Sequence, residues 1–141
     1  MTMKKRALYL ILPSVTLILE ILPYGAVCNF MRPPATDGDP VGHFRKLYSY
    51  FDLTPFGYAN FAPLLTALAT CVILALLVVY LFTNNPRILS FAKASLCIAS
   101  ILSFGPLLYG INFFSLVGAL ISISLIGELV LLICVSRSQR K

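Results

Sequence analysis

The sequence predicts an all-α integral membrane protein in which four transmembrane helices form an antiparallel bundle. Of its 141 residues, 59% are hydrophobic and only 11% are charged, whereas soluble domains average about 45–50% and about 25%. The apolar residues also fall into four long runs. Disordered chains are polar and rich in charge, so the composition excludes disorder together with a soluble fold. We expect a single membrane domain that covers residues 1–141.

Four apolar runs give the predicted membrane spans. A helix needs about 20 mostly apolar residues to cross the hydrocarbon core of a bilayer. Runs of this length occur at residues 7–27, 60–82, 88–109 and 113–135. Between the second and third runs, Asn85 can cap a new helix, and Pro86 suits its first position because no backbone N–H is needed there. Short turns therefore join the last three spans, which run antiparallel to one another.

The first run admits a second interpretation, as a cleaved signal peptide. It has a basic start at residues 4–6, an apolar stretch and a cysteine, Cys28, at its end. However, Val27 is bulky where a small residue is wanted before the cysteine. The run is also long for a signal peptide, and it carries Glu20. We therefore expect the first run to remain in the protein as a helix.

The positions of the basic residues predict the orientation of the chain, because Lys and Arg gather on the cytoplasmic side of a membrane. With the N-terminus inside, the inner side holds Lys4, Lys5, Arg6, Arg87, Arg137, Arg140 and Lys141. The outer side holds Arg32, Arg45 and Lys46. We expect both termini in the cytoplasm and the chain in the plasma membrane. Because these charges flank the spans, they indicate contact with the lipid bilayer and no nucleic-acid binding.

Residues 28–59 form an outer segment between the first two spans that is long for a plain connection. Its apolar residues recur at helical spacing, at Phe44, Leu47, Tyr48 and Phe51. This spacing predicts a short helix that lies on the membrane surface. The same stretch also alternates, at Phe44, Lys46, Tyr48 and Tyr50, as a strand would. The choice between helix and strand stays open.

Aromatic side chains are enriched at protein interfaces, and the outer segment is rich in them. It could therefore serve as a lid or as a surface to which a partner binds. The simpler alternative is that the rings only lie at the depth of the lipid headgroups. The candidate partner-docking surface comprises Phe44, Leu47, Tyr48, Tyr50 and Phe51.

Lys93 and Glu128 are ionisable residues inside two predicted spans. A charge near the middle of a membrane costs about 2.5–3.5 kcal/mol even on the most lenient scale. Lys93 lies about 8 Å and Glu128 about 10 Å from the inner ends of their spans, at 1.5 Å per residue. The two residues therefore share a depth on sequential helices. We expect a structural ion pair between them, unless Lys93 extends to the inner surface and leaves Glu128 to another partner.

Glu20 lies in the other half of the first span, and no basic residue shares its depth. We expect it to contact hydroxyl groups of the second span, at Thr66 or Thr70, and to keep its proton in apolar surroundings. Such a carboxyl could bind and release protons, or it could only join two helices by a hydrogen bond. Pro13 and Pro23 flank Glu20 and can kink its helix, as helices are kinked at many transport sites. The candidate proton or polar site therefore comprises Glu20, Thr66 and Thr70.

Motifs of enzymes and cofactors are absent from the sequence. It has a single histidine, His43, no Cys-x-x-Cys, no nucleophile elbow and no phosphate-binding loop. Asp37 and Asp39 lie in a turn-like Asp-Gly-Asp-Pro segment, which offers too few oxygens for a calcium ion. We expect no enzymatic activity, no cofactor and no metal site.

These observations favour a small, non-enzymatic, multi-pass membrane protein that acts through contacts with other membrane proteins or with a second copy of itself. The aromatic outer segment is the main support for this interpretation. The alternative is a small proton-coupled transporter, dimeric because four helices leave little room for a pore, in which Glu20 carries the proton. The sequence does not identify a substrate or a partner.

Overall fold

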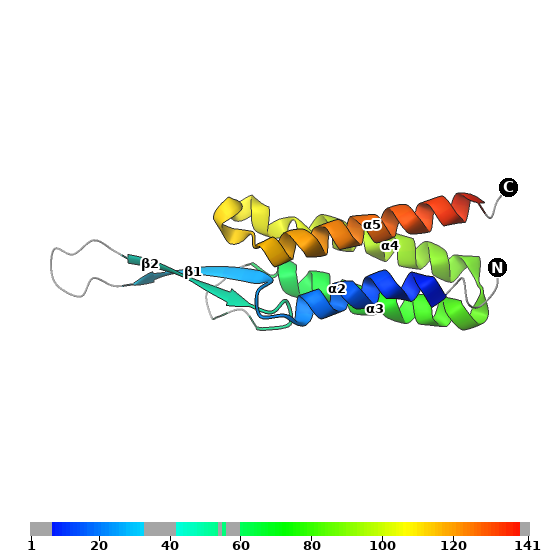
Figure 1. Ribbon diagram of the computed structural model, residues 1–141, viewed down its shortest axis with the longest axis horizontal. Helices are drawn as coiled ribbons and strands as arrows, with labels where there is room; N and C mark the ends of the chain where they lie inside the picture. The colour runs from blue at the N-terminus through cyan, green and yellow to red at the C-terminus, as the bar shows by residue number, and fades with distance from the viewer. Residues whose placement is uncertain (1–6, 33–41, 54, 56–59, 139–141) are drawn as a thin grey trace.

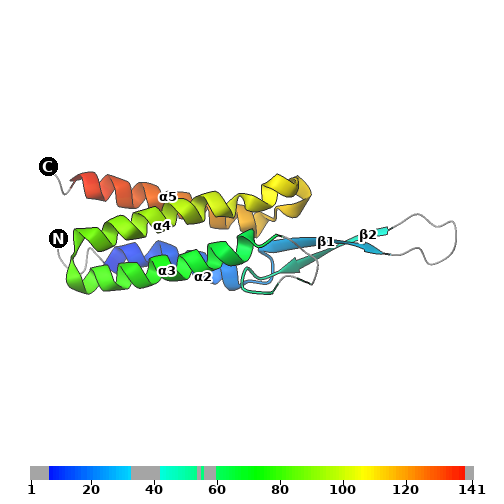
Figure 2. The same ribbon diagram turned by 180° about the vertical axis from the view of Figure 1, so that it is seen from behind.

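A computed structural model of the chain describes residues 7–32, 42–53, 55 and 60–138. Four α-helices lie side by side, and a β-hairpin leads away from one end of them (Figure 1). Figure 2 shows the same arrangement from behind. The helices are α2 (Ile11–Ile21), α3 (Ala62–Thr83), α4 (Pro86–Ser103) and α5 (Leu116–Ser138). We call the end from which the hairpin leads the hairpin end, and the opposite end, where α2 begins and α5 ends, the terminal end.

Short 3-10 helices complete the helical part of the chain. They are η1 (Leu8–Leu10), η2 (Gly105–Tyr109) and η3 (Ile111–Phe113). Three stretches are long and apolar enough to cross a membrane, and they are Ala62–Thr83, Pro86–Tyr109 and Leu116–Cys134. A fourth apolar helix, Leu8–Ile21, is shorter and rises only about 21 Å at 1.5 Å per residue. The protein is therefore mostly helical and has the composition of a membrane protein.

The first helix ends well before the predicted boundary at residue 27. Leu22 already has an extended backbone, with φ −63° and ψ 138°. The cause is Pro23, because the ring of a proline disfavours the helical conformation in the residue before it. From Ala26 onward the chain is a β-strand. The predicted span 7–27 is therefore wrong at its second end.

The turn between α3 and α4 is the one that the sequence predicts. The side chain of Asn85 accepts a hydrogen bond from the backbone N–H of Arg87 at 3.0 Å, and Pro86 occupies the first turn of α4. Asn84, in the left-handed conformation at φ 51°, ends α3 and donates its N–H to the carbonyl of Tyr80. At the start of α5, Ser115 Oγ accepts a hydrogen bond from the N–H of Gly118 at 2.8 Å. This serine is the cap of α5.

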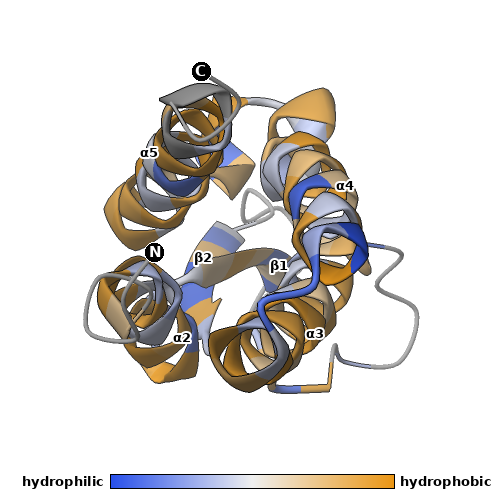
Figure 3. Ribbon diagram, turned by 90° about the vertical axis from the view of Figure 1, so that its right-hand side faces the viewer, coloured by the Kyte–Doolittle hydropathy of each residue, from blue (hydrophilic) through white to orange (hydrophobic). Residues whose placement is uncertain are grey.

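The four helices form a ring when they are viewed along their axes (Figure 3). In that ring α2 packs between α3 and α5, and α4 packs between the same two helices on the other side. The interior is closed by small and branched apolar side chains, among them Ala67, Ile73, Leu77, Leu96, Ile121, Leu125 and Leu132. Large apolar side chains, including Ile18, Phe82, Ile101 and Ile123, are exposed on the outside. Water would not favour such a surface, whereas lipid would.

The outer segment contains a β-hairpin, which the helical prediction did not include, beside helices that are consistent with an all-α membrane protein. Strand β1 (Ala26–Arg32) pairs antiparallel with β2 (Gly42–Tyr48), with Ala26 opposite Tyr48 and Arg32 opposite Gly42. The rings of Phe30 and Phe44 stack across the strands, with centroids 5.2 Å apart. Of the two alternatives for this segment, the helix is wrong and the strand is confirmed. A strand needs a partner, and β1 is the partner that the sequence analysis had partly assigned to the first helix.

Several predicted features lie outside the described residues. They are the basic residues Lys4, Lys5, Arg6, Arg140 and Lys141, and the turn that contains Asp37 and Asp39.

Candidate functional site

All four helices carry buried polar side chains, and the two buried glutamates lie on the antiparallel neighbours α2 and α5. Thr16 and Glu20 lie four residues apart on α2, and Ser124 and Glu128 lie four residues apart on α5. Residues four apart share one face of a helix. Thr16 and Glu20 are 0% exposed, and Glu128 is 1% exposed. The ring therefore encloses two carboxyl groups and two hydroxyl groups at one helix contact, and we call these four residues the polar interior.

Glu20 contacts the second of its two predicted hydroxyl partners. Thr70 Oγ1 of α3 donates a hydrogen bond to Glu20 Oε1 at 2.8 Å. Thr66 is also buried, but its hydroxyl donates to the carbonyl of Ala62 in its own helix at 2.8 Å. The second carboxyl oxygen, Glu20 Oε2, has no hydrogen-bond partner. The predicted contact with Thr70 is present, and Thr66 only lies one turn from it.

Thr16 and Ser124 form a direct contact that the sequence analysis missed. Their hydroxyl oxygens lie 2.6 Å apart, and Thr16 Oγ1 also donates to the carbonyl of Leu12 at 3.0 Å. Because Thr16 has one hydroxyl proton, Ser124 is the donor between the two hydroxyls while Thr16 bonds Leu12. The signal in the sequence was a hydroxyl four residues before each intramembrane glutamate. Recognising it required knowing that α2 packs on α5.

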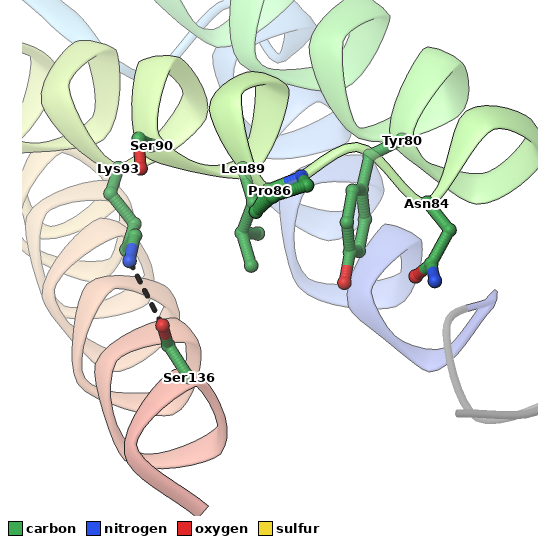
Figure 4. Close-up of a pocket in the computed structure, with 7 residues that line it drawn as sticks. All are labelled: Tyr80, Asn84, Pro86, Leu89, Ser90, Lys93 and Ser136. Atoms are coloured by element: carbon green, nitrogen blue, oxygen red, sulfur yellow. Dashed lines mark hydrogen bonds between the residues drawn. The ribbon is translucent and has the colours of Figure 1, made fainter. Parts of the chain in front are cut away.

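The predicted ion pair between Lys93 and Glu128 is not formed. Lys93 Nζ donates a hydrogen bond to Ser136 Oγ at 3.1 Å, near the terminal end (Figure 4). Neither carboxyl oxygen of Glu128 has a hydrogen-bond partner. Glu128 instead lies close enough to Glu20 for the two carboxyls to interact electrostatically. Equal depth did not bring Lys93 to Glu128, because its flexible stem directs the ammonium group toward the end of the bundle.

Tyr50 closes the polar interior at the hairpin end. Its ring is 1% exposed and lies so close to Gly25 that a Cβ there would come within 2.7 Å of Tyr50 Cδ1. Its hydroxyl has no hydrogen-bond partner and lies beside Gly118 of α5. Burial, and then the nearby carboxyl of Glu20, raise the pKa of Tyr50 above its usual range. Tyr50 is therefore a neutral, buried ring, and its prediction as a docking residue is wrong.

The residues after β2 hold the last turn of α2. The backbone N–H of Tyr50 and the hydroxyl of Ser49 both donate to the backbone carbonyl of Glu20, each at 2.9 Å. The side chain of Asp52 in turn accepts the N–H of Ser49 at 2.7 Å. These bonds attach the base of the hairpin to the helix that carries the first glutamate. The hairpin and the polar interior are therefore mechanically joined at Glu20.

The hairpin itself exposes most of the predicted docking surface. Phe44 is 48% exposed, Leu47 and Phe51 are exposed, and Tyr48 is half-buried under the ammonium group of Lys46 at 5.1 Å. Met31, which the sequence analysis did not single out, is 74% exposed. Among the described residues, no second strand pairs with β2 besides β1, and β1 is bridged to Phe114 at Ala26. The hairpin thus presents the outer edge of β2 together with exposed apolar side chains.

A pocket of about 320 Å³ lies at the terminal end, between α3, α4 and α5. Its lining residues are Tyr80, Asn84, Pro86, Leu89, Ser90, Lys93 and Ser136 (Figure 4). The lining is largely polar and includes the hydrogen bond between Lys93 and Ser136. Among the described parts of the chain, no three His, Cys, Asp or Glu side chains are grouped as a metal site would require.

Comparisons with protein-family models, with curated proteins and with solved structures found no match to this chain.

Proposed function

We propose that the protein is a multi-pass plasma-membrane protein without enzymatic activity, which acts by binding another membrane protein through its β1–β2 hairpin. The observation that carries this proposal is the hairpin, which leads away from the helices with exposed apolar side chains and with an edge of β2 that no other described strand covers. A two-stranded hairpin is only marginally stable by itself in water. A third strand from a partner would satisfy its edge and extend the sheet.

The proposed topology has four spans, with both termini in the cytoplasm and the hairpin outside. The short first helix is the weakest span, since about 30 Å of hydrocarbon must be crossed. The start of β1, at Ala26–Cys28, is buried against the rest of the protein and can extend the first span, because non-helical backbone is tolerated at membrane depth where protein covers it. The positions of the basic residues support the orientation.

The chemistry of the hairpin favours an acidic, extended segment as the partner. The described residues of β1 and β2 carry Arg32, Arg45 and Lys46 and no acidic side chain. Their charges would attract acidic groups and align them along the open edge. Met31 and Phe44 would supply the apolar contacts. We therefore propose that the partner adds an acidic strand to the hairpin, outside the membrane.

Site-specific photo-crosslinking in the native membrane tests this proposal. A photoreactive residue at position 31 should crosslink one defined membrane protein, whereas the same probe at position 123 on the outer face of α5 should label lipid. Reversing the charges with Arg45→Glu and Lys46→Glu should reduce that crosslink at least tenfold while the membrane level of the chain is unchanged. A crosslink to a second copy of the chain would mean that the hairpin binds another copy of the same protein and not a different protein. Labelling of lipid alone at both positions would contradict docking by the hairpin.

A second candidate, a dimeric proton-coupled transporter that uses Glu20, is favoured by one specific observation. Glu20 is fully buried, bonds only Thr70 through one oxygen and leaves the other oxygen without a partner. Under this proposal, Glu20→Gln abolishes proton-coupled uptake and leaves assembly intact. Uptake measured in cells, beside the oligomeric state in mild detergent, separates a loss of transport from a loss of assembly. Full uptake by the Glu20→Gln protein would contradict this candidate.

A further inference from the structure

The register between α2 and α5 places the two buried carboxyls on opposite sides of a hydroxyl pair. The contact between Thr16 and Ser124 sets these two residues at one level. Four residues of helix rise about 6 Å, so Glu20 lies one turn toward the hairpin end. Because α5 runs the other way, Glu128 lies one turn toward the terminal end. The backbones of Glu20 and Glu128 therefore lie on opposite sides of the hydroxyl pair, and each side chain leans back toward that pair, because side chains tilt toward the start of their own helix.

The carboxyl groups are left without the partners that buried polar groups normally have. Three of their four oxygens lack a hydrogen bond, although both side chains are completely enclosed. More than nine in ten buried polar groups in proteins have a partner. A carboxylate in such surroundings is far more costly than the neutral acid, and a negative charge on one carboxyl disfavours a charge on the other. At least one of the two groups therefore carries a proton, and the pair does not hold two negative charges together.

We propose that Glu20, Thr16, Ser124 and Glu128 form a proton relay through the ring of helices. Starting with Glu128 as the acid and Glu20 ionised, Glu128 gives its proton to Ser124 Oγ while Ser124 gives its own proton to Thr16 Oγ1. The hydroxyl of Thr16 turns away from Leu12 and gives its proton to Glu20. One proton has moved, both hydroxyls are restored, Glu20 is the acid and Glu128 is ionised. Glu20 then releases a proton at the hairpin end, and Glu128 takes up another from the terminal end.

The surroundings of the two carboxyls are compatible with this direction of transfer and with its reverse. The ionisable groups on which the charge of Glu20 acts are Tyr50 at the hairpin end, Cys71 on α3 and Glu128. Toward the terminal end, Tyr80 and Lys93 line the polar pocket, and the relay requires that Glu128 take up its proton from this side. The only fixed positive charge among these groups, on Lys93, bonds Ser136. It leaves Glu128 free to change its protonation state.

The geometry favours a proton over a larger cation. A metal cation needs several oxygens around one point, and among the described residues no three His, Cys, Asp or Glu side chains are grouped in this way. A side chain added at Gly127 would already contact Leu12 at 3.7 Å, so α2 and α5 are closely packed beside Glu128. A proton requires no cavity and only the rotation of hydroxyl and carboxyl groups. The inference shares Glu20 with the second candidate function, but it requires no transported substrate.

Proton flux into liposomes that contain the purified protein tests the relay. A potassium diffusion potential set with valinomycin drives the flux, and a pH-sensitive dye inside the liposomes reports it. The unmodified protein should acidify the lumen at least tenfold faster than empty liposomes do. Glu20→Gln and Glu128→Gln should each return the rate to that of empty liposomes. Ser124→Ala should lower it at least fivefold, because it removes the middle of the relay.

The control is Thr83→Ala, which removes an exposed hydroxyl that bonds only the carbonyl of Val79 in its own helix, and it should leave the flux unchanged. Circular dichroism and gel filtration in detergent ensure that each variant compared is folded. A rate equal to that of empty liposomes for the unmodified protein would overturn the relay, as would full flux in Glu128→Gln or movement of sodium in place of protons. None of these results bears on crosslinking by the hairpin or on substrate-dependent uptake, so the three proposals fail separately.

Discussion

The polar interior and the β1–β2 hairpin distribute polar and apolar groups in opposite ways. Between α2 and α5, carboxyl and hydroxyl groups are enclosed, whereas Met31 and Phe44 on the hairpin are exposed. In the interior, three carboxyl oxygens lack hydrogen-bond partners. On the hairpin, apolar side chains are left uncovered, and no further described strand extends the two-stranded sheet. Both regions lack something that a folded domain usually supplies for itself. This difference supports a proton as the ligand proposed for the polar interior and another protein as the ligand proposed for the hairpin.

The two regions meet at Glu20, whose backbone carbonyl accepts hydrogen bonds from Ser49 and Tyr50 while its side chain faces Thr70. Substitutions at this junction should affect folding most. Substitutions inside the interior should trade stability against function, and those on the hairpin should hardly affect folding at all.

The largest effect should follow Tyr50→Ala. Removing a completely buried aromatic side chain typically costs about 3–5 kcal/mol, and here it would also open the space between Gly25 and α5. The midpoint of thermal unfolding in detergent measures the change. Tyr24→Ala, at an exposed tyrosine on the same connection, is the control and should change the stability by less than about 0.5 kcal/mol. If both substitutions lowered the thermal stability equally, the buried ring of Tyr50 would not be what encloses the polar interior at the hairpin end.

Glu128→Met should have the opposite sign. Replacing a buried polar group that lacks partners by an apolar side chain of similar shape removes a desolvation cost of about 1–3 kcal/mol. We therefore expect higher thermal stability together with loss of proton flux. Glu20→Met should stabilise the protein less, because it also removes the acceptor of Thr70. If Glu128→Met lowered the stability, Glu128 would have a stabilising partner and the contrast between the two regions would weaken.

Lys93→Met should have a small effect. Breaking a buried ion pair by removing one partner costs about 3–5 kcal/mol. Lys93 bonds only the hydroxyl of Ser136 in a polar pocket, so its loss should cost at most about 1 kcal/mol. Unfolding by heat or denaturant distinguishes these two values. Ser136→Ala should reproduce the effect of Lys93→Met, and the double substitution should add little to either.

The smallest effect on folding should follow Met31→Ser. The side chain is mostly exposed on a strand that leads away from the helices, and such substitutions usually change stability by less than about 0.5 kcal/mol. Capture of the partner should nevertheless fall severalfold, because an apolar contact of the proposed interface is lost. Parallel measurements of thermal unfolding and of partner recovery from membranes test this separation. A large fall in stability would mean that Met31 packs against the protein itself.

Predictions from the sequence held where one segment carries its own signal. The turn at Asn85 and Pro86 and the long helices were predicted in this way. The contact between Glu20 and Thr70 joins two segments and was nevertheless one of two predicted alternatives. The early end of the first helix could have been predicted as well, because Pro23 acts on its own neighbour. The boundary was placed too late because the apolar run continues past Pro23 to Val27.

Predictions failed where the outcome depended on which segments meet. Depth along the membrane placed Lys93 and Glu128 together, but depth does not determine the face that a side chain occupies. The spacing of Phe44, Leu47, Tyr48 and Phe51 matched a helix as well as a strand, and pairing with β1 decided for the strand. Tyr50 looked like an exposed interface residue until Gly25 and α5 enclosed it.

The composition and the lengths of the apolar runs are enough to predict a mostly helical protein that fits a lipid bilayer, because the hydrophobicity and length of a segment do not depend on the other segments. The sequence also determined that a carboxyl would be enclosed on the first helix. The packing of the whole chain is needed to place Glu20 and Glu128 on either side of the contact of Thr16 with Ser124, and to pair residues 26–32 with residues 42–48 as two strands. Both outcomes depend on the register between segments far apart in the chain, which the packing of the whole ring determines.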